Sequence, residues 1–129
     1  MSIDAYLWRA YSEICIEFIT EWDSENYVII TAWNPQSRKL SNELNRIKNL
    51  DLEQRLKIYD YQNVKVGNPS FSWVEDSFAV EMTLAQGCEL AQKYQQNAIY
   101  WVENGVLFLV SCDESQTQKK LGRLGDFLR

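Results

Sequence analysis

The chain contains no histidine, and this absence removes several reaction classes at once. A Ser-His-Asp or Cys-His catalytic arrangement needs an imidazole as its general base. The usual zinc sites depend on histidine or on closely spaced cysteines. We therefore expect no metal site of the common kinds.

Cysteine and glycine are also scarce. Cys15, Cys88 and Cys112 are odd in number, and none of them forms a CxxC pair. This pattern favours buried, reduced thiols in a reducing cytosol. Neither glycine-rich phosphate-binding pattern, GxxxxGK[ST] or GxGxxG, is present, so we expect no cofactor.

Long apolar runs and an excess of basic charge are missing too. No run approaches the roughly 20 apolar residues that cross a bilayer. The N-terminus has no apolar core long enough for a signal peptide, so we expect a cytoplasmic protein without membrane contact. The net charge of -5 argues against general nucleic-acid binding, which needs clustered Lys and Arg, and is compatible with a basic protein partner.

The residues that are present predict a single domain with a real core, since 46% of the 129 residues are hydrophobic. Apolar spacing predicts helices near 3–12, 41–59 and 83–95, and strands over 14–20, 27–33, 62–67, 77–83 and 98–112. The last stretch contains Asn104-Gly105, which is typical of a tight hairpin turn. The returning strand over 27–33 is apolar on both faces, which indicates a central place in the sheet.

Helices alternating with strand pairs indicate an α+β domain. We expect a mainly antiparallel sheet of ββ pairs separated by helices, in the order α-ββ-α-ββ-α-ββ. Residues 1–115 would form this domain. Residues 116–129 are expected to be a basic C-terminal tail or a short helix, because leucines recur there at helical spacing while two glycines weaken an isolated helix.

The helix expected over 41–59 carries two stripes. The apolar stripe, which we expect to face the core, consists of Leu44, Ile47, Leu52, Leu56 and Tyr59. The other stripe is made of asparagines: Asn42, Asn45 and Asn49. This polar stripe either faces water or faces a polar pocket opposite Asn34.

Amide and acidic side chains gather where expected strands begin or end. Asn34 precedes Pro35 directly after "ITAW", and either forms an Asx-turn with its own backbone or lines a site. Glu75 lies within an otherwise apolar β stretch, either in a turn or facing a cleft. Gln96 and Asn97 precede the last hairpin.

The stretches "ITAWNP", "SNELNRIKN", a glycine followed by "WVEDSFAV", and "QNAIYWVENGVLFLVSC" together resemble the DUF3293 family of small bacterial proteins. The resemblance covers residues 27–112. It implies a compact bacterial domain, and it supplies no reaction because the family's biochemical function is unassigned. The positions that match the recurrent pattern are Thr31, Asn34, Pro35, Asn45, Gly67, Glu75, Gln96 and Asn97.

These observations favour non-covalent binding of a small polar ligand or of a protein partner. Asn and Gln amides can both donate and accept hydrogen bonds, and the aromatic residues Trp33, Trp73, Tyr100 and Trp101 are either core or the walls of a site. The expected ligand-binding residues are Thr31, Asn34, Asn45, Glu75, Gln96 and Asn97. The alternative is a small enzyme that uses Glu75 as general base in an Asn/Gln-lined cleft, although no complete catalytic set is visible.

Overall fold

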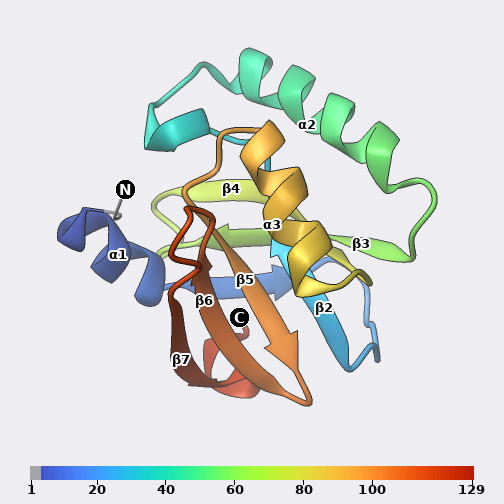
Figure 1. Ribbon diagram of the computed structural model, residues 1–129, viewed down its shortest axis with the longest axis vertical. Coiled ribbons are helices and arrows are strands. Elements are labelled where there is room, and N and C mark those ends of the chain that lie inside the picture. The colour runs from blue at the N-terminus through green and yellow to red at the C-terminus, as the bar shows by residue number, and fades with distance from the viewer. Residues whose placement is uncertain (1–3) are drawn as a thin grey trace.

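One curled, antiparallel sheet organises the protein in the computed structural model, which describes residues 4–129 (Figure 1). Within these residues the sheet has seven strands in the order β1-β3-β4-β2-β5-β6-β7. The strands are β1 (Cys15–Phe18), β2 (Asn26–Ile30), β3 (Tyr61–Gly67), β4 (Val74–Val80), β5 (Ala98–Glu103), β6 (Val106–Ser111) and β7 (Gln118–Arg123). The helices are α1 (Ala5–Ser12), α2 (Asn42–Leu56), α3 (Leu84–Lys93) and the short 3-10 helices η1 (Pro35–Ser37) and η2 (Leu124–Phe127).

The α+β class, the single domain and the antiparallel sheet expected from the sequence are confirmed. The apolar β2 lies at the centre of the strand order, paired with β4 and β5. β1 does not pair with β2, although they are consecutive; it pairs with β3 instead. The hairpin turn is also confirmed, because Asn104 and Gly105 take positive φ values of 49° and 80° between β5 and β6.

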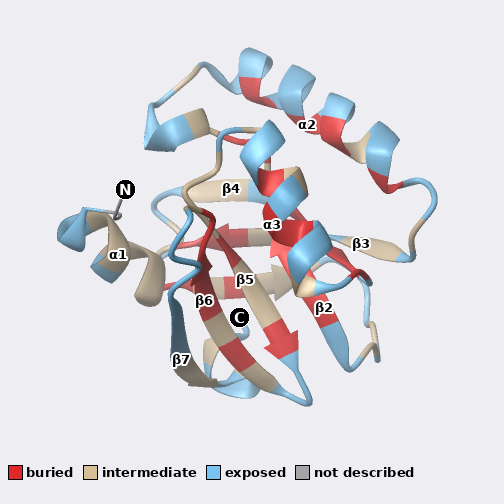
Figure 2. Ribbon diagram, viewed as in Figure 1, coloured by how far each residue is buried: buried red, intermediate tan, exposed pale blue. Residues whose placement is uncertain are grey.

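The sheet separates two apolar cores (Figure 2). The helix-side core lies between the sheet and the helices α2 and α3, and includes Val28, Ile30, Leu52, Leu56, Cys88, Ala91 and Ile99. The inner core lies on the opposite, concave face, and includes Ile16, Tyr27, Ile29, Val64, Ala79 and Leu107. Both faces of β2 are therefore buried, which explains its continuous apolar sequence.

Residues 116–129 differ from the expected tail or isolated short helix. Gln118–Arg123 pairs with β6 as strand β7, and only the following η2 is helical. The leucine spacing has a different origin, because Leu121 and Leu124 pack against the inner core. The chain end then returns to the opposite edge of the sheet, where Arg129 N donates to Ile16 O at 2.8 Å.

The apolar stripe expected to bury α2 is partly wrong. Leu44 and Ile47 are 50% and 56% exposed, whereas Asn45 and Asn49 are 1% and 6% exposed. Further along the helix, Leu52 and Leu56 are buried as expected, and Asn42 is exposed. The first half of α2 thus covers a polar part of the sheet, and only its second half covers the apolar core.

Gly87 weakens α3 intrinsically, yet the fold requires it. A Cβ atom at this position would lie 2.7 Å from Cγ1 of Val28 and 3.1 Å from Cδ1 of Ile99. Glycine costs the helix about 1 kcal/mol of stability relative to alanine. The close packing of α3 against the sheet, which only glycine allows here, offsets this cost. Near the N-terminus, Asp4 caps α1, because its carboxylate accepts from Tyr6 N at 2.8 Å. Residue 3, the expected start of this helix, lies outside the described residues.

Candidate functional site

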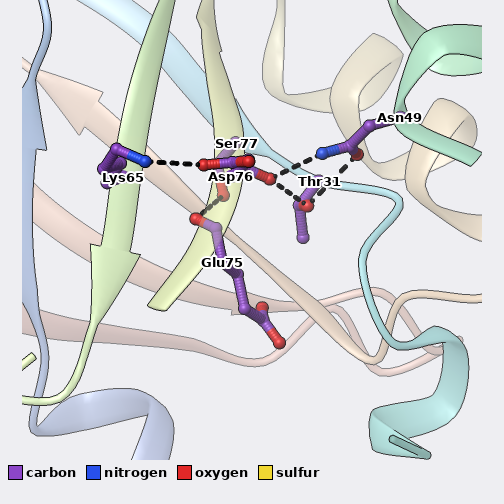
Figure 3. Close-up of polar contacts among 6 residues, drawn as sticks. All are labelled: Thr31, Asn49, Lys65, Glu75, Asp76 and Ser77. Carbon is purple, nitrogen blue, oxygen red and sulfur yellow. Dashed lines mark hydrogen bonds and ion pairs between the residues drawn. The ribbon is translucent and has the colours of Figure 1, made fainter. Parts of the chain in front are cut away.

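Asn49 provides hydrogen-bond partners for backbone groups near the end of β2 (Figure 3). Its Oδ1 accepts from Ala32 N at 2.8 Å, and its Nδ2 donates to Asp76 O on β4 at 2.8 Å. Thr31 Oγ1 donates to the same carbonyl at 2.7 Å. These contacts join α2, β2 and β4, so the burial of Asn49 is explained by backbone groups that need partners.

Asn45 fixes Asn34 in the same way, one helical turn earlier. Asn45 Oδ1 accepts from Asn34 N, and Asn45 Nδ2 donates to Asn34 Oδ1, both at 2.8 Å. Asn34 Oδ1 also accepts from Leu40 N at 2.9 Å, so Asn34 closes a longer loop than an Asx-turn. We call Asn45 and Asn49 the helix-side amide cluster.

Asn34 adopts a left-handed conformation with φ of 47°, and the neighbouring Gln36 and Ser37 have φ of 56° and 58°. Such backbone is costly for residues other than glycine and concentrates at functional sites. The conformation leaves Asn34 Nδ2 able to donate to Glu75 Oε2 at 3.3 Å. A chain of contacts therefore runs from α2 through Asn45 and Asn34 to the carboxylate of Glu75.

Glu75 points away from the neighbouring ion pair (Figure 3), and it lies opposite Val66 of the inner core in the β3–β4 register. Lys65 Nζ lies 3.1 Å from Asp76 Oδ1, and no salt bridge among the described residues includes Glu75. Burial raises the pKa of Glu75 to about 7, and the hydrogen bond from Asn34 opposes this increase. The carboxyl is thus held partly out of water without a cation beside it.

A cavity of about 80 Å³ surrounds this carboxyl, which we call the inner cavity. Besides Glu75, its polar or aromatic lining consists of Tyr11, Thr31, Trp33, Asn34, Ser37, Trp73, Ser77, Gln96, Asn97 and Tyr100. The hydroxyls of Tyr11 and Ser37 are hydrogen-bonded to each other. Asn97 Nδ2 donates to both at 3.2 Å, and Tyr100 Oη donates to Tyr11 O at 2.6 Å. These bonds attach α1 and η1 to the sheet at the cavity.

The structure brings most of the expected site residues together. Thr31, Asn34, Glu75, Gln96 and Asn97 line the inner cavity, and Asn45 lies behind Asn34 without lining it. Thr31 faces the helix-side amide cluster with its hydroxyl.

Three polar lining residues, Tyr11, Ser37 and Ser77, are absent from the site expected from the sequence. Tyr11 falls on an apolar helix stripe and reads as core, and Ser37 reaches the cavity only through the positive φ angles of its loop. The aromatics divide as well: Trp33, Trp73 and Tyr100 line the cavity, whereas Trp101 packs against the helix-side core.

Residues 30–99 match the family described as protein of unknown function (DUF3293), and this match spans more than half of the chain. The chain therefore belongs to the DUF3293 family, and all six expected site residues lie within the matched stretch. Comparison with curated proteins and with solved structures found no match. Across residues 4–129, none of the helices is long and apolar enough to cross a membrane, and no three His, Cys, Asp or Glu side chains are grouped to hold a metal ion.

Proposed function

We propose that this DUF3293 protein binds a small polar ligand non-covalently in the inner cavity, with the carboxyl of Glu75 as the central contact. One observation carries the proposal: the carboxyl of Glu75 lies in a cavity and, within the described part of the chain, has a single hydrogen bond, from Asn34, and no ion pair. Burying a carboxylate in this way costs stability. A ligand that completes its interactions would explain why the fold carries this cost.

The surroundings of Glu75 support the same conclusion because they are fixed before any ligand arrives. Asn45 holds Asn34 through two hydrogen bonds, and Asn34 in turn contacts the carboxyl. On the other side, Asn97 holds the Tyr11 and Ser37 hydroxyls. A preformed site loses less conformational freedom on binding, and therefore binds more tightly.

A thermal-shift screen against metabolites and nucleotides tests the proposal. A ligand that raises the melting temperature of the wild-type protein should fail to do so in both Glu75→Gln and Asn34→Ala. Asp76→Asn is the matched control, since Asp76 is the next residue on β4, is exposed and pairs with Lys65. Ligands that stabilise Glu75→Gln as much as the wild type would contradict binding at the inner cavity.

Catalysis is the second candidate, and the pKa of about 7 for Glu75 is the observation that favours it. A carboxyl with this pKa is partly ionised near neutral pH, as a general base must be. Hydroxyls of Tyr11 and Ser37 lie in the same cavity and could contact a reacting group. Each hit of the screen should be incubated with the protein and followed by NMR for product. Turnover that disappears in Glu75→Gln while binding remains would assign the enzyme function.

A protein partner is the other form of binding that the sequence favours, and a more open hollow of about 340 Å³ between α2 and β3 supports it, with Ile19 and Leu50 exposed there. Affinity capture with the wild type and with Leu50→Glu tests this version. We also propose a cytoplasmic location in a bacterium, supported by three free thiols, of which Cys88 and Cys112 are buried. Fractionation of cells that express the tagged protein tests the location.

A further inference from the structure

The hydrogen-bond donors of the inner cavity are largely used within the protein. Both N–H groups of Gln96 have partners, since Nε2 donates to Trp33 O at 3.2 Å and to Tyr94 O at 3.3 Å. Asn97 Nδ2 likewise donates to two hydroxyls. Tyr100 Oη donates to a carbonyl. Among the described residues, the side-chain donors that remain are one N–H of Asn34, one proton of the Tyr11–Ser37 hydroxyl pair, and the indole N–H groups of Trp33 and Trp73.

The acceptors of the cavity, by contrast, are largely unused. The Glu75 carboxyl accepts only from Asn34 Nδ2, at 3.3 Å. Among the residues that the structure describes, no hydrogen bond reaches Oε1 of Gln96 or Oδ1 of Asn97. A carboxylate and two amide oxygens together provide several free lone pairs. A ligand that satisfies them must therefore bring hydrogen-bond donors.

The charge, the aromatic lining and the size of the inner cavity further restrict the class of ligand. No Lys or Arg is among the described residues that line the inner cavity, so residues 4–129 supply no counter-ion to the negative charge of Glu75 there. The aromatic rings of Trp33, Trp73, Tyr11 and Tyr100 also line it, and aromatic faces attract cations. Pockets for drug-sized ligands have volumes of about 300–1,000 Å³, so a volume of about 80 Å³ favours a compact head group over a whole nucleotide.

We propose that the inner cavity binds the cationic head group of its ligand, an ammonium, a methylated ammonium or a guanidinium, with the Glu75 carboxylate as counter-ion and the aromatic walls around it. This inference rests on the proposed binding function and names its ligand class. The head group can belong to a free small amine or to a Lys or Arg side chain of a peptide.

The inference also fixes the direction of the pH dependence. The titratable groups that line the cavity are Glu75 itself and the phenols of Tyr11 on α1 and Tyr100 on β5. Burial raises the pKa of Tyr100 above its ordinary value, so this phenol stays neutral near pH 7. A cation binds best when Glu75 is ionised. Affinity should therefore rise between pH 6 and pH 8, and binding should lower the pKa of Glu75.

NMR titration of the side-chain amides of Asn34, Gln96 and Asn97 tests the inference with matched probes at constant ionic strength. Guanidinium is paired with urea, which has nearly the same shape without the charge, and methylammonium is paired with methanol. We expect saturable shifts with both cations and at least tenfold weaker binding of the neutral partners. Glu75→Gln should weaken cation binding at least tenfold, and Asp76→Asn should leave it unchanged.

Two further comparisons distinguish a free small amine from a peptide side chain as the source of the head group. Butylammonium is compared with acetyl-lysine amide, and guanidinium with acetyl-arginine amide. Tighter binding of the amino-acid derivatives assigns a peptide side chain, and equal or weaker binding assigns a free small amine; either result supports the cationic class.

Two results would contradict the inference. If urea or methanol bound as tightly as its cationic partner, the ligand class would be wrong while the proposed binding function remained. If none of the probes gave a saturable shift at any of the three amides, the cationic class would be overturned, while the thermal-shift screen would still decide the proposed small-ligand function.

Discussion

Asn49 and Asn97 are both asparagines beside the end of a strand, one on the helix side of the sheet and one at the inner cavity. Asn49 is almost fully buried. Its amide oxygen accepts from Ala32 N just after β2, and its amide nitrogen donates to Asp76 O on β4. Asn97 is partly exposed, uses its nitrogen on two hydroxyls, and receives no hydrogen bond at its oxygen from the described residues.

The same contrast extends to the neighbours of the two residues. Asn45 and Thr31 bind other parts of the chain and complete the fold. The carboxyl of Glu75 has one hydrogen bond and no ion pair within residues 4–129. Folding thus explains the helix-side amide cluster, whereas the acceptors left free at the inner cavity point to a ligand. Hydrogen-bond use, more than residue type, therefore separates the two roles.

The largest effect should come from Asn49→Ala. Removing this side chain leaves the buried Ala32 N–H without a partner and takes one of two donors from Asp76 O. We expect the free energy of unfolding to fall by about 2 to 3 kcal/mol in urea denaturation. Asn42→Ala on the exposed face of the same helix should change it by less than about 0.5 kcal/mol. Equal losses of stability in the two variants would contradict the role of Asn49 in completing the fold.

Glu75→Gln should have the next largest effect, and in the opposite direction. The folded-state pKa of about 7 exceeds the ordinary value of 4.5, so the folded wild-type protein loses stability as pH rises between these values. At about 1.4 kcal/mol per pH unit, and reduced for partial contact with water, we expect Glu75→Gln to gain about 2 kcal/mol over the wild type between pH 5 and pH 8. Urea denaturation at both pH values measures this difference.

Asp76→Asn serves as the control for this pH experiment, since Asp76 is exposed and pairs with Lys65. Its stability relative to the wild type should not follow the trend of Glu75→Gln. A Glu75→Gln variant whose advantage is the same at pH 5 and pH 8 would show that the carboxyl is not withdrawn from water.

The energetic coupling between the helix-side amide cluster and the inner cavity should be smaller than these two effects. Asn34 and Asn45 share two hydrogen bonds. The double variant of Asn34→Ala and Asn45→Ala should therefore cost about 1 kcal/mol less than the sum of the single variants. Asn34→Ala should also raise the pKa of Glu75, because the hydrogen bond from Asn34 lowers it. Additive costs would show that the two asparagines act independently.

The smallest effect on stability is expected for Asn97→Ala, about 0.5 kcal/mol, because the Tyr11 and Ser37 hydroxyls keep their mutual hydrogen bond. Guanidinium binding should nevertheless weaken, since the free amide oxygen is lost. Denaturation together with NMR titration separates these two results. A large loss of stability without an effect on binding would place Asn97 with the helix-side amide cluster.

Much of the fold follows from local sequence patterns. The Asn104-Gly105 turn and the apolar β2 act through neighbouring residues, so periodicity and turn preferences suffice to predict them. β7 could not be identified because its sequence lacks the apolar alternation of a strand and its leucines recur at helical spacing, while the strand forms by pairing with the edge of β6. The exposed face of α2 was assigned wrongly for a similar reason: the helix covers polar strand ends, which reverse the usual preference for apolar contacts.

The candidate site could be predicted in part from amides at strand ends. Asn34, Glu75 and Asn97 come from segments far apart in the sequence, and the sheet brings them to one cavity. Tyr11 and Ser37 could not be identified, because α1 reaches the cavity only through tertiary contacts such as the bond from Tyr100. The difference between Asn45 and Asn97 was also invisible, since hydrogen-bond use depends on the folded backbone.

The titration of the Glu75 carboxyl by NMR of the side-chain carbon is the most direct measurement. We expect a pKa of about 7 in the free protein, and a lower value when guanidinium is added. A pKa near the ordinary 4.5 that does not respond to guanidinium would contradict a carboxyl held in the inner cavity for a cationic ligand.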